Sequence, residues 1–521
     1  MRMINLLFLY NCERFLFILV FLINTFSLMY GKHNCSINNY QQYLNIDQDT
    51  LPDSYCFDID DSLLCVFNPE IQVKPIYIPF TSNPFVHTLK KHITPKDSSC
   101  GDYLILTTPS LYDSLTCELQ TYIEDVHTIY GYGIYLEIVE NFNCQNLKSL
   151  IISYQDCLKG VFFVGSLSDC MFEIDNDHNK YGYRKWPCDL YFMDIDGVWN
   201  DSDNNGIYDA HTGNVSPDIF FGRLSAERIP NSYGSEVSLI RKQFQKSHSF
   251  WWKSSFHRPD SILNYIDKDW KNFFAPNNIA QSLQQGIVDD IRYGTDTCFS
   301  PEDYLRRISR PYYGFVHLAA HSSPSLHSFT NGIITTTDLW QNQSNSYVFL
   351  LFCCSACNWK ANVTNGYLGG TYLFNLGKTM AVIGSTKTGS MGSPTKFCSS
   401  LPSNHIGNAL VKWWKYYHGE YHEPEDISWG YGMTLLGDPT IKLWHNVSDI
   451  CEENLVLTQF PDNNYSNLVM WKAESNIVVE PTFVIPQGVH VILDAPNINL
   501  KPGFSCPIGA SFETRNEGCE L

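Results

Sequence analysis

The sequence is poor in charged residues, and positive charge in particular is scarce. Asp, Glu, Lys and Arg make up 17% of the 521 residues, and 35 basic side chains stand against 54 acidic ones, a formal net charge of −19 at pH 7. No run of Lys and Arg is longer than two residues. These features argue against nucleic acid as a partner, because nucleic-acid-binding proteins carry clustered positive charge. With 44% apolar residues, the chain is not a largely disordered one.

Long apolar runs are also lacking, apart from one at the N-terminus. The run FLFILVFLI spans residues 15–23, follows Arg2 and Arg14, and leads to the small residue Gly31. Its nine uninterrupted apolar residues are fewer than the ~20 that a membrane-spanning helix needs. We therefore predict a signal peptide over residues 1–31, with a membrane anchor as the weaker alternative, and no stable membrane span after its cleavage. The sequence thus predicts a secreted or cell-surface protein.

Cysteine is plentiful, and its count is informative. Of the 18 cysteines, only Cys12 lies in the predicted signal peptide, so 17 remain. Disulfides are expected in an exported chain, but an odd number leaves at least one thiol unpaired or paired between molecules. A reactive cysteine and a stray buried cysteine both fit this count.

Hydrophobic periodicity predicts an α/β protein. From residue 101 onward, strand patterns such as GDYLILTTP alternate with helical patterns such as SLTCELQTYIEDVHTIYG, which is typical of a parallel sheet with helices on both faces. Further strand patterns occupy residues 261–266, 314–320, 347–352 and 380–385. Residues 32–98 lack a helical period and predict a β-rich N-terminal region. Residues 448–521, with short apolar alternations broken by Pro and Gly, predict a small C-terminal β module.

Two of these strands end in residues that can carry out nucleophilic chemistry. His321 follows the strand 314–320, and Cys354 follows the strand 347–352. Because ligand sites in such sheets lie beyond the carboxyl ends of strands, we expect the thiol and the imidazole to face one cleft, as a cysteine peptidase requires. The backbone N–H groups of Ser322 and Cys354 are the expected donors to an oxyanion.

The same residues allow other interpretations. Cys353, Cys354 and Cys357 include a Cys-X-X-X-Cys pair that can form a disulfide, and buried cysteines at strand ends are usually structural. His317 and His321 could be imagined as zinc ligands together with these thiols, although a rigid zinc site normally places two ligands closer on a turn or helix. For His317, inside an apolar run, we favour a core histidine that is satisfied by a hydrogen bond.

The segment DLYFMDIDGVWNDSDNNGIYDAHTG, residues 189–213, concentrates acidic side chains. Oxygen-bearing side chains alternate there around a turn glycine in the order of a calcium loop: Asp201, Asp203, Asn205 and Asp209. Thr212 stands where an EF-hand has a bidentate glutamate, so an EF-hand is rejected. We predict bound calcium with a structural role, with Asp194 and Asp196 as further candidate ligands, and no organic cofactor. The alternative is a solvated turn that binds no ion tightly.

Together these signals resemble the gingipain-like cysteine peptidases, a family with a caspase-like α/β fold. The resemblance covers residues 99–447 and rests, in chain order, on YLILTTP, GVFFVG, DLYFMDIDG with its Asp-rich loop, FFGRLSA, ILNYIDKDW, AVIGSTKTGS and LLGDPTIKLW. It implies a first α/β subdomain at residues 99–187 and a caspase-like catalytic subdomain at residues 188–447. The catalytic histidine of the family then falls on His321 and its nucleophile on Cys354. Endopeptidase activity on protein or peptide substrates follows from the same resemblance.

One feature departs from the family pattern. His321 stands in Ala-His-Ser, whereas the family has Gly-His-Gly, and a glycine after the histidine helps a backbone N–H to approach the oxyanion. The alternative function is therefore a catalytically inactive caspase-like domain that acts as a secretion or surface-assembly component. In the C-terminal region, GVHVILDAPNINLKPGFSCPIGASFE resembles the short coat-hanger β modules of proteins exported by Bacteroidetes.

Overall fold

The computed structural model describes residues 54–59, 62–67, 86–95, 101–252, 261–274, 279, 288–296, 298–420, 428–443, 452–460, 468–487 and 489–516. The predicted signal peptide lies outside the described residues. The chain divides into two units, residues 1–74 and 75–521. In the first unit, β1 (Ser54–Ile59) and β2 (Ser62–Phe67) form an antiparallel hairpin. Among the described helices, none combines the length and hydrophobicity needed to cross a membrane.

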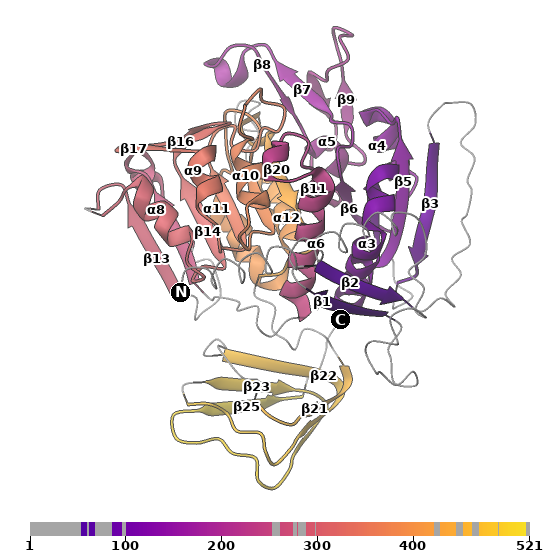
Figure 1. The fold of residues 1–521 in the computed structure, drawn as a ribbon, viewed down its shortest axis with the longest axis vertical. Coiled ribbons are helices and arrows are strands. Elements are labelled where there is room, and N and C mark those ends of the chain that lie inside the picture. The colour runs from indigo at the N-terminus through magenta and orange to yellow at the C-terminus, as the bar shows by residue number, and fades with distance from the viewer. Residues whose placement is uncertain are drawn as a thin grey trace, which may run out of the picture. The chain divides into compact units, whose positions relative to one another are not determined.

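A sheet of 11 strands forms the centre of the second unit (Figure 1). In spatial order the strands are β13 (Val288–Tyr293), β12 (Ser261–Ile266), β14 (Phe315–Ala319), β18 (Val348–Phe352), β19 (Ala381–Ser385), β20 (Met433–Gly437), β11 (Phe220–Leu224), β6 (Leu158–Val164), β4 (Asp102–Thr107), β5 (Gly133–Glu140) and β3 (Val86–Ile93). Neighbours run parallel except at β19/β20 and β5/β3, so two parallel halves of opposite direction meet at β19 and β20. The predicted α/β class with a mostly parallel sheet is confirmed.

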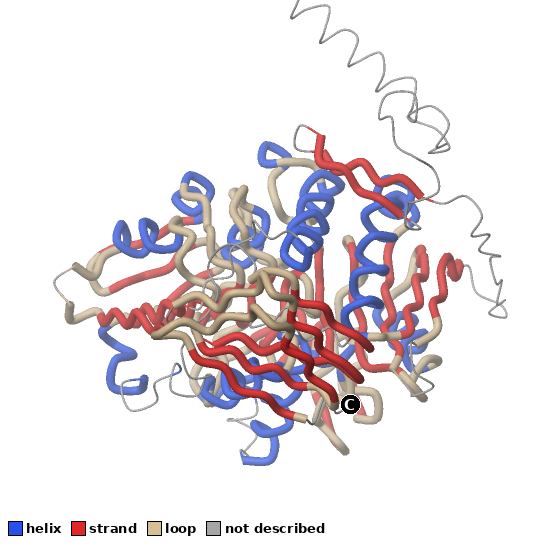
Figure 2. The backbone as a smooth tube through the Cα atoms, turned by 90° about the horizontal axis from the view of Figure 1, so that it is seen from below, coloured by secondary structure: helices blue, strands red, loops and turns tan. Residues whose placement is uncertain are grey.

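Helices flank this sheet. They are α3 (Pro109–Tyr130), α4 (Cys144–Ile152), α5 (Leu190–Met193), α6 (Glu236–Trp252), α7 (Lys271–Phe274), α8 (Pro301–Ile308), α9 (Thr336–Gln341), α10 (Leu368–Phe374), α11 (Pro394–Ser400) and α12 (Ile406–Glu420). Figure 2 shows helices on both sides of the sheet. Strands β14 and β18 are buried at every position, and since successive side chains of a strand point to opposite faces, both faces are covered there.

Helix α3 shows how the sequence determines such an element. Pro109 occupies its first turn, where the missing N–H has no helical partner to lose, and apolar residues recur at helical spacing from Leu111 to Val126 on the buried side. The helix ends at Gly131, whose φ of 69° is readily adopted only without a side chain. The Gly131 N–H donates to the carbonyl oxygen of His127 and so closes the last turn.

Shorter elements lie in the loops between the strands of the sheet. They are β7 (Met171–Ile174), η3 (Asp177–Asn179), β8 (Arg184–Pro187), β9 (Val198–Asn200), β10 (Ala210–Thr212), η4 (Asn231–Tyr233), η5 (Lys268–Trp270), β15 (His321–Ser323), β16 (Leu326–Phe329), β17 (Gly332–Thr335) and η7 (Leu401–Ser403). The large sheet contains strands from both sides of two domain boundaries that the sequence predicts. β3 lies within residues 32–98 but pairs with β5, and β11 pairs with both β6 and β20 across the boundary at residue 187.

The C-terminal strands form a sheet of their own with a separate hydrophobic core. They are β21 (Glu452–Leu457), β22 (Leu468–Val479), β23 (His490–Asp494), β24 (Asn497–Leu500) and β25 (Ser511–Arg515). These strands pair in parallel at nearly constant spacing, since Leu468 pairs with His490 and His490 with Ser511, 22 and 21 residues apart. Three phenylalanines contact one another at a similar interval, with ring centroids 5.6 and 6.3 Å apart: Phe460, Phe483 and Phe504. The module is thus built of parallel strands that recur at a nearly constant interval. The sequence analysis missed this internal repeat.

Candidate active site

The two predicted catalytic residues lie next to each other at one edge of the large sheet. Strands β14 and β18 are parallel neighbours, with Ala319 paired to Phe352. His321 and Cys354 each follow this pair by two residues, so they leave the sheet side by side. The hydroxyl of Ser322 donates to the carbonyl oxygen of Cys354 and joins the two strand ends. The register therefore places His321 and Cys354 at the same end of two neighbouring strands, where the strand pattern predicts them.

His321 is in contact with a carboxylate that the sequence analysis did not assign. The imidazole is 53% exposed, its Nε2 lies 3.3 Å from Oδ2 of Asp269, and the ring of Trp270 is 5.4 Å away, centroid to centroid. Asp269 belongs to η5, which directly follows β12, and the side chain of Asp267 caps this turn by accepting the Asp269 N–H. A carboxylate in this position can orient the imidazole and stabilise its protonated form.

The imidazole is turned toward Asp269, and in the described part of the chain it forms no hydrogen bond with the Cys354 thiol. Catalytic hydrogen bonds are often long in enzymes without substrate and tighten when substrate binds, so this orientation is compatible with proton transfer. The sequence held only part of the signal for Asp269, because two acidic residues, Asp267 and Asp269, follow the strand 261–266 and the strand pattern does not choose between them.

Cys354 precedes a strained turn. Ser355 has a φ of 54°, in the left-handed region that residues other than glycine rarely adopt. Two hydrogen bonds hold this turn, from the Ser355 N–H to the Lys387 carbonyl oxygen at 2.7 Å and from the Cys357 N–H to the Ser385 carbonyl oxygen at 3.0 Å. Both acceptors lie at or just after the end of β19. The turn that carries the thiol is thus fixed by the next strand of the sheet.

The three neighbouring cysteines differ in burial. Cys354 is partly exposed, whereas Cys353 and Cys357 are buried in the core. The Cys353 thiol donates to the carbonyl oxygen of Leu318 at 3.8 Å. All three are unpaired thiols, so the disulfide considered from the sequence is not formed. Of the three, only Cys354 offers its sulfur to a substrate.

Opposing influences act on the ionisation of Cys354. Burial raises the pKa of the thiol above its ordinary value, and the carboxylate of Asp177 acts in the same direction. The backbone N–H of Gly389, which donates to the sulfur, and the ammonium group of Lys387 lower this pKa. Burial also raises the pKa of the two neighbouring, fully buried thiols. Burial is the largest influence, so the pKa of the Cys354 thiol lies above its ordinary value, and of these three thiols the least buried, Cys354, forms the thiolate most readily.

Residues 265–444 match the model of peptidase family C25. The matched segment contains Asp269, His321 and Cys354, and its 180 residues are about a third of the 521 in the chain. The match confirms, over this segment, the predicted resemblance to the gingipain-like cysteine peptidases and supports a cysteine peptidase. It ends before the C-terminal module, whose resemblance to coat-hanger modules stays a prediction.

Two solved structures are similar to this chain. One is a crystal structure of the Arg-specific cysteine proteinase gingipain R (RGPB), with 14% sequence identity and a TM-score of 0.46, and the likeness covers 67% of this chain and 79% of that chain. The other, described as "Structure of Protease", has 14% identity, a TM-score of 0.47 and the same coverage of each chain. No curated protein matches the chain.

Within the C25-like segment, the structure accommodates the residue that replaces the first glycine of the family's histidine turn. Ala320 is buried, and its N–H donates to the carbonyl oxygen of Phe352 at 3.3 Å, so this N–H is used within the sheet. Ser322, which replaces the second glycine, lies in β15 and pairs with His327 of β16. The backbone N–H groups of Ser322 and Cys354 remain the candidate oxyanion donors.

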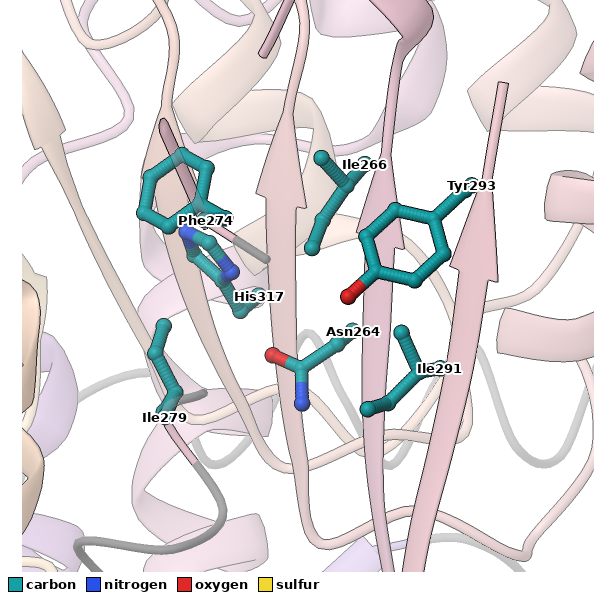
Figure 3. A pocket seen from close by; sticks show the side chains of 7 residues that line it. All are labelled: Asn264, Ile266, Phe274, Ile279, Ile291, Tyr293 and His317. Atoms are coloured by element: carbon teal, nitrogen blue, oxygen red, sulfur yellow. The ribbon is translucent and has the colours of Figure 1, made fainter. Parts of the chain in front are cut away.

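His317, in the interior of β14, does not have the predicted hydrogen bond. Among the described residues, neither of its ring nitrogens has a hydrogen-bond partner, and burial lowers the pKa of His317 to about 3, which keeps the ring neutral. The ring lines a small pocket of about 10 Å³. Figure 3 shows the residues around it: Asn264, Ile266, Phe274, Ile279, Ile291, Tyr293 and His317. Among the described residues, no group of three potential metal ligands includes His317, so the zinc alternative finds no support.

The predicted calcium ligands lie in two different places. The carboxylate oxygens of Asp194 and Asp196 lie within 4.8 Å of one another and of Asp218, which the sequence analysis missed. Asp218 lies just before β11, where the chain comes back beside residues 193–195. Its N–H donates to the carbonyl oxygen of Met193 at 2.9 Å, and its carboxylate accepts the Ile195 N–H at 2.6 Å. No local spacing links residues so far apart in the chain.

The predicted calcium loop, by contrast, is closed by its own hydrogen bonds. The two oxygens of Asp201 accept the N–H groups of Asn205 at 3.1 Å and Gly206 at 2.8 Å. The carboxylate of Asp209 accepts the N–H of Ser202 at 3.1 Å and its hydroxyl at 2.9 Å. In the described residues, the carboxylates of this loop do not come together as a group of three.

Proposed function

We propose that the chain is an exported cysteine endopeptidase in which Cys354 is the nucleophile and His321 carries the proton. The supporting observation is the shared register of β14 and β18, which brings both residues to one edge of the sheet within the C25-like segment. Asp269, 3.3 Å from the imidazole, is proposed to orient it. Proteins and peptides outside the cytoplasm are the proposed substrates.

In the proposed mechanism, the Cys354 thiolate attacks the carbonyl carbon of the scissile peptide bond. The oxyanion of the tetrahedral intermediate accepts hydrogen bonds from the backbone N–H groups of Ser322 and Cys354. Protonated His321 gives its proton to the leaving amine as the C–N bond breaks, which leaves a thioester. Neutral His321 then takes a proton from the water molecule that attacks the thioester. Release of the acid restores the thiolate and the protonated imidazole.

A peptide probe with a thiol-reactive end group tests this function. We expect it to label Cys354 faster than Cys506, a partly buried thiol of the C-terminal module, because in the proposed mechanism the imidazole of His321 comes within reach of the Cys354 thiol when a peptide binds and then stabilises the thiolate. His321→Ala should slow the labelling of Cys354 by about tenfold, as expected for a thiol pKa about one unit higher, and leave that of Cys506 unchanged. Peptide mapping by mass spectrometry measures both rates in one sample.

The same measurement can contradict the proposal. Equal labelling rates at the two thiols, or no effect of His321→Ala, would favour the alternative, a catalytically inactive domain that acts as a secretion or surface-assembly component.

We also propose that calcium binds at Asp194, Asp196 and Asp218 and stabilises the fold. The fit rests on the donor set, because three carboxylates within 4.8 Å of one another supply only oxygen ligands, which Ca²⁺ prefers. Gly197 lies close against the first of these carboxylates, since a Cβ there would lie 2.3 Å from Oδ2 of Asp194, and its N–H donates to Oδ1 of Asp194 at 2.8 Å.

Chelation is expected to lower the melting temperature of the protein. A ligand that binds only the folded state adds about 2.7 kcal/mol of stability at a hundredfold excess over Kd. EGTA should therefore lower the Tm of wild type in calcium-containing buffer, and Asp218→Asn should remove most of this shift. Asp203→Asn is the control. It changes the loop that contains Asp201 and Asp209, and it should retain the shift in Tm on addition of EGTA. Calorimetry that shows no EGTA shift in wild type would contradict calcium binding, and a shift lost only in Asp203→Asn would place the ion in the loop.

A further inference from the structure

A buried ion pair lies beside the proposed nucleophile. The Nζ atom of Lys387 is 2.8 Å from Oδ1 of Asp177, and the two side chains are 1% and 0% exposed. The ammonium also donates to the carbonyl oxygen of Ser428 at 3.1 Å and lies 4.8 Å from the centre of the Trp186 ring. These contacts hold the positive charge at one position.

The same lysine belongs to the loop that holds the turn of the nucleophile. Lys387 follows β19, and its carbonyl oxygen accepts the Ser355 N–H. Two residues later, the N–H of Gly389 donates to the Cys354 sulfur. Gly389 has a φ of 137°, and a Cβ there would lie 2.4 Å from the carbonyl oxygen of Trp429, so this position requires glycine. The loop thus brings a backbone dipole and a positive charge to the thiol.

Folding alone does not account for this ion pair. Removing charges from water costs several kcal/mol per ion, and a well-packed apolar pair of similar volume is often as stable or more stable. In the part of the chain that the structure describes, Oδ2 of Asp177 has no hydrogen-bond partner, and a buried polar atom without a partner costs free energy. An effect of the charge on the neighbouring thiol does account for it.

We propose that Lys387, held by Asp177, is a positioning residue whose positive charge stabilises the thiolate of Cys354. The proposal rests on the proposed function, in which this thiolate is the nucleophile. His321 and Asp269 are more than half exposed, so water screens their charges, whereas Lys387 acts from the buried side, where screening is weaker. Of the two buried charges, the ammonium has a larger effect on the thiol than the carboxylate.

The pH dependence of Cys354 alkylation tests this proposal without requiring peptidase turnover. Lys387→Met should raise the pH midpoint of the reaction of Cys354 with iodoacetamide by about one unit, because a charge close to a group typically shifts its pKa by about 1–3 units. Lys387→Arg keeps the positive charge and should keep the midpoint near that of wild type. Peptide mapping reads the reaction at Cys354 alone.

A second variant covers the case in which Lys387→Met fails to fold with Asp177 unpaired. The double variant Lys387→Met/Asp177→Asn replaces the ion pair by neutral groups of similar size. Its midpoint should lie between those of wild type and Lys387→Met, because the smaller, opposing effect of the carboxylate is removed together with that of the ammonium. Circular dichroism identifies the variants that are folded.

Lys360→Met is the matched control. Lys360 pairs with Asp169, with Nζ 2.5 Å from Oδ2, and is not among the groups that act on Cys354, so the midpoint should not move. Wild-type midpoints in folded Lys387→Met and in folded Lys387→Met/Asp177→Asn would overturn the proposal and leave the ion pair as a structural link between its loop and η3. An equal shift in Lys360→Met would overturn it as well. The midpoint could shift in Lys387→Met and not in Lys360→Met, while the wild-type protein hydrolyses no peptide. That combination would contradict the proposed function and leave this proposal intact.

Discussion

Cys354→Ala is expected to abolish peptide-bond hydrolysis and to leave the fold intact. Removing the nucleophile of a hydrolase typically lowers kcat by about 10⁶-fold, since the remaining groups cannot form a covalent intermediate. The fold should persist because Cys354 is only partly buried and forms no disulfide. The measurement is kcat/KM with fluorogenic peptides in reducing, calcium-containing buffer, together with the Tm of each variant.

The two adjacent cysteines are the matched controls for this experiment. Cys353→Ala and Cys357→Ala should retain hydrolysis and lower the Tm, because both thiols are buried and their loss leaves small cavities that cost about 1 kcal/mol. Cys357 is tightly packed against two glycines. A Cβ added at Gly369 or at Gly384 would lie 2.8 Å from its sulfur. Hydrolysis that survives Cys354→Ala and is lost in Cys353→Ala would move the nucleophile to the other face of the strand.

The position of the candidate site was predictable because it depends on strand direction alone. Alternating periodicities identify β14 and β18 as buried strands, and parallel neighbours end at one edge of a sheet. His321 and Cys354 each stand two residues past the paired residues Ala319 and Phe352, so strand direction places them at one end of the sheet, and the structure adds that the two strands are neighbours. The same reasoning applied to β12 leads to the loop that begins at Asp267 but does not single out Asp269, because Ile266 pairs with Ala319 and two residues past it stands Lys268.

Contacts between distant segments were not predictable from local patterns. Lys387 and Asp177 are 210 positions apart, and each taken alone looks like an ordinary surface residue of a polar loop. Asp218 reaches Asp194 because hydrogen bonds return its segment to Met193 and Ile195. An apolar run predicts that His317 is buried, but whether its ring finds a hydrogen-bond partner depends on the side chains that pack across it. Such features require the three-dimensional structure.

Arg223→Met is expected to lower the free energy of unfolding by about 3–5 kcal/mol, the usual cost of leaving one partner of a buried ion pair alone. Arg223 lies in β11 and is 2% exposed, with Nη2 2.7 Å from Oδ1 of Asp189. Its Nη1 is 3.4 Å from Asp169, and the guanidinium lies 4.8 Å from the centre of the Trp359 ring. Methionine fills much of the space but supplies no charge to the buried carboxylate. Urea unfolding followed by tryptophan fluorescence measures the loss.

Two further variants separate the charge of Arg223 from its packing. Arg223→Met/Asp189→Asn removes both charges and should recover much of the loss, since the Thr434 hydroxyl, which donates to Asp189 Oδ2 at 2.6 Å, can still donate to an amide oxygen. Lys91→Met breaks a partly exposed pair with Glu124 and should cost only about 0–1 kcal/mol. Equal losses in the single and double variants would assign the stability to packing of the guanidinium. A loss in Arg223→Met as small as that in Lys91→Met would mean that water reaches the carboxylate, contrary to its burial.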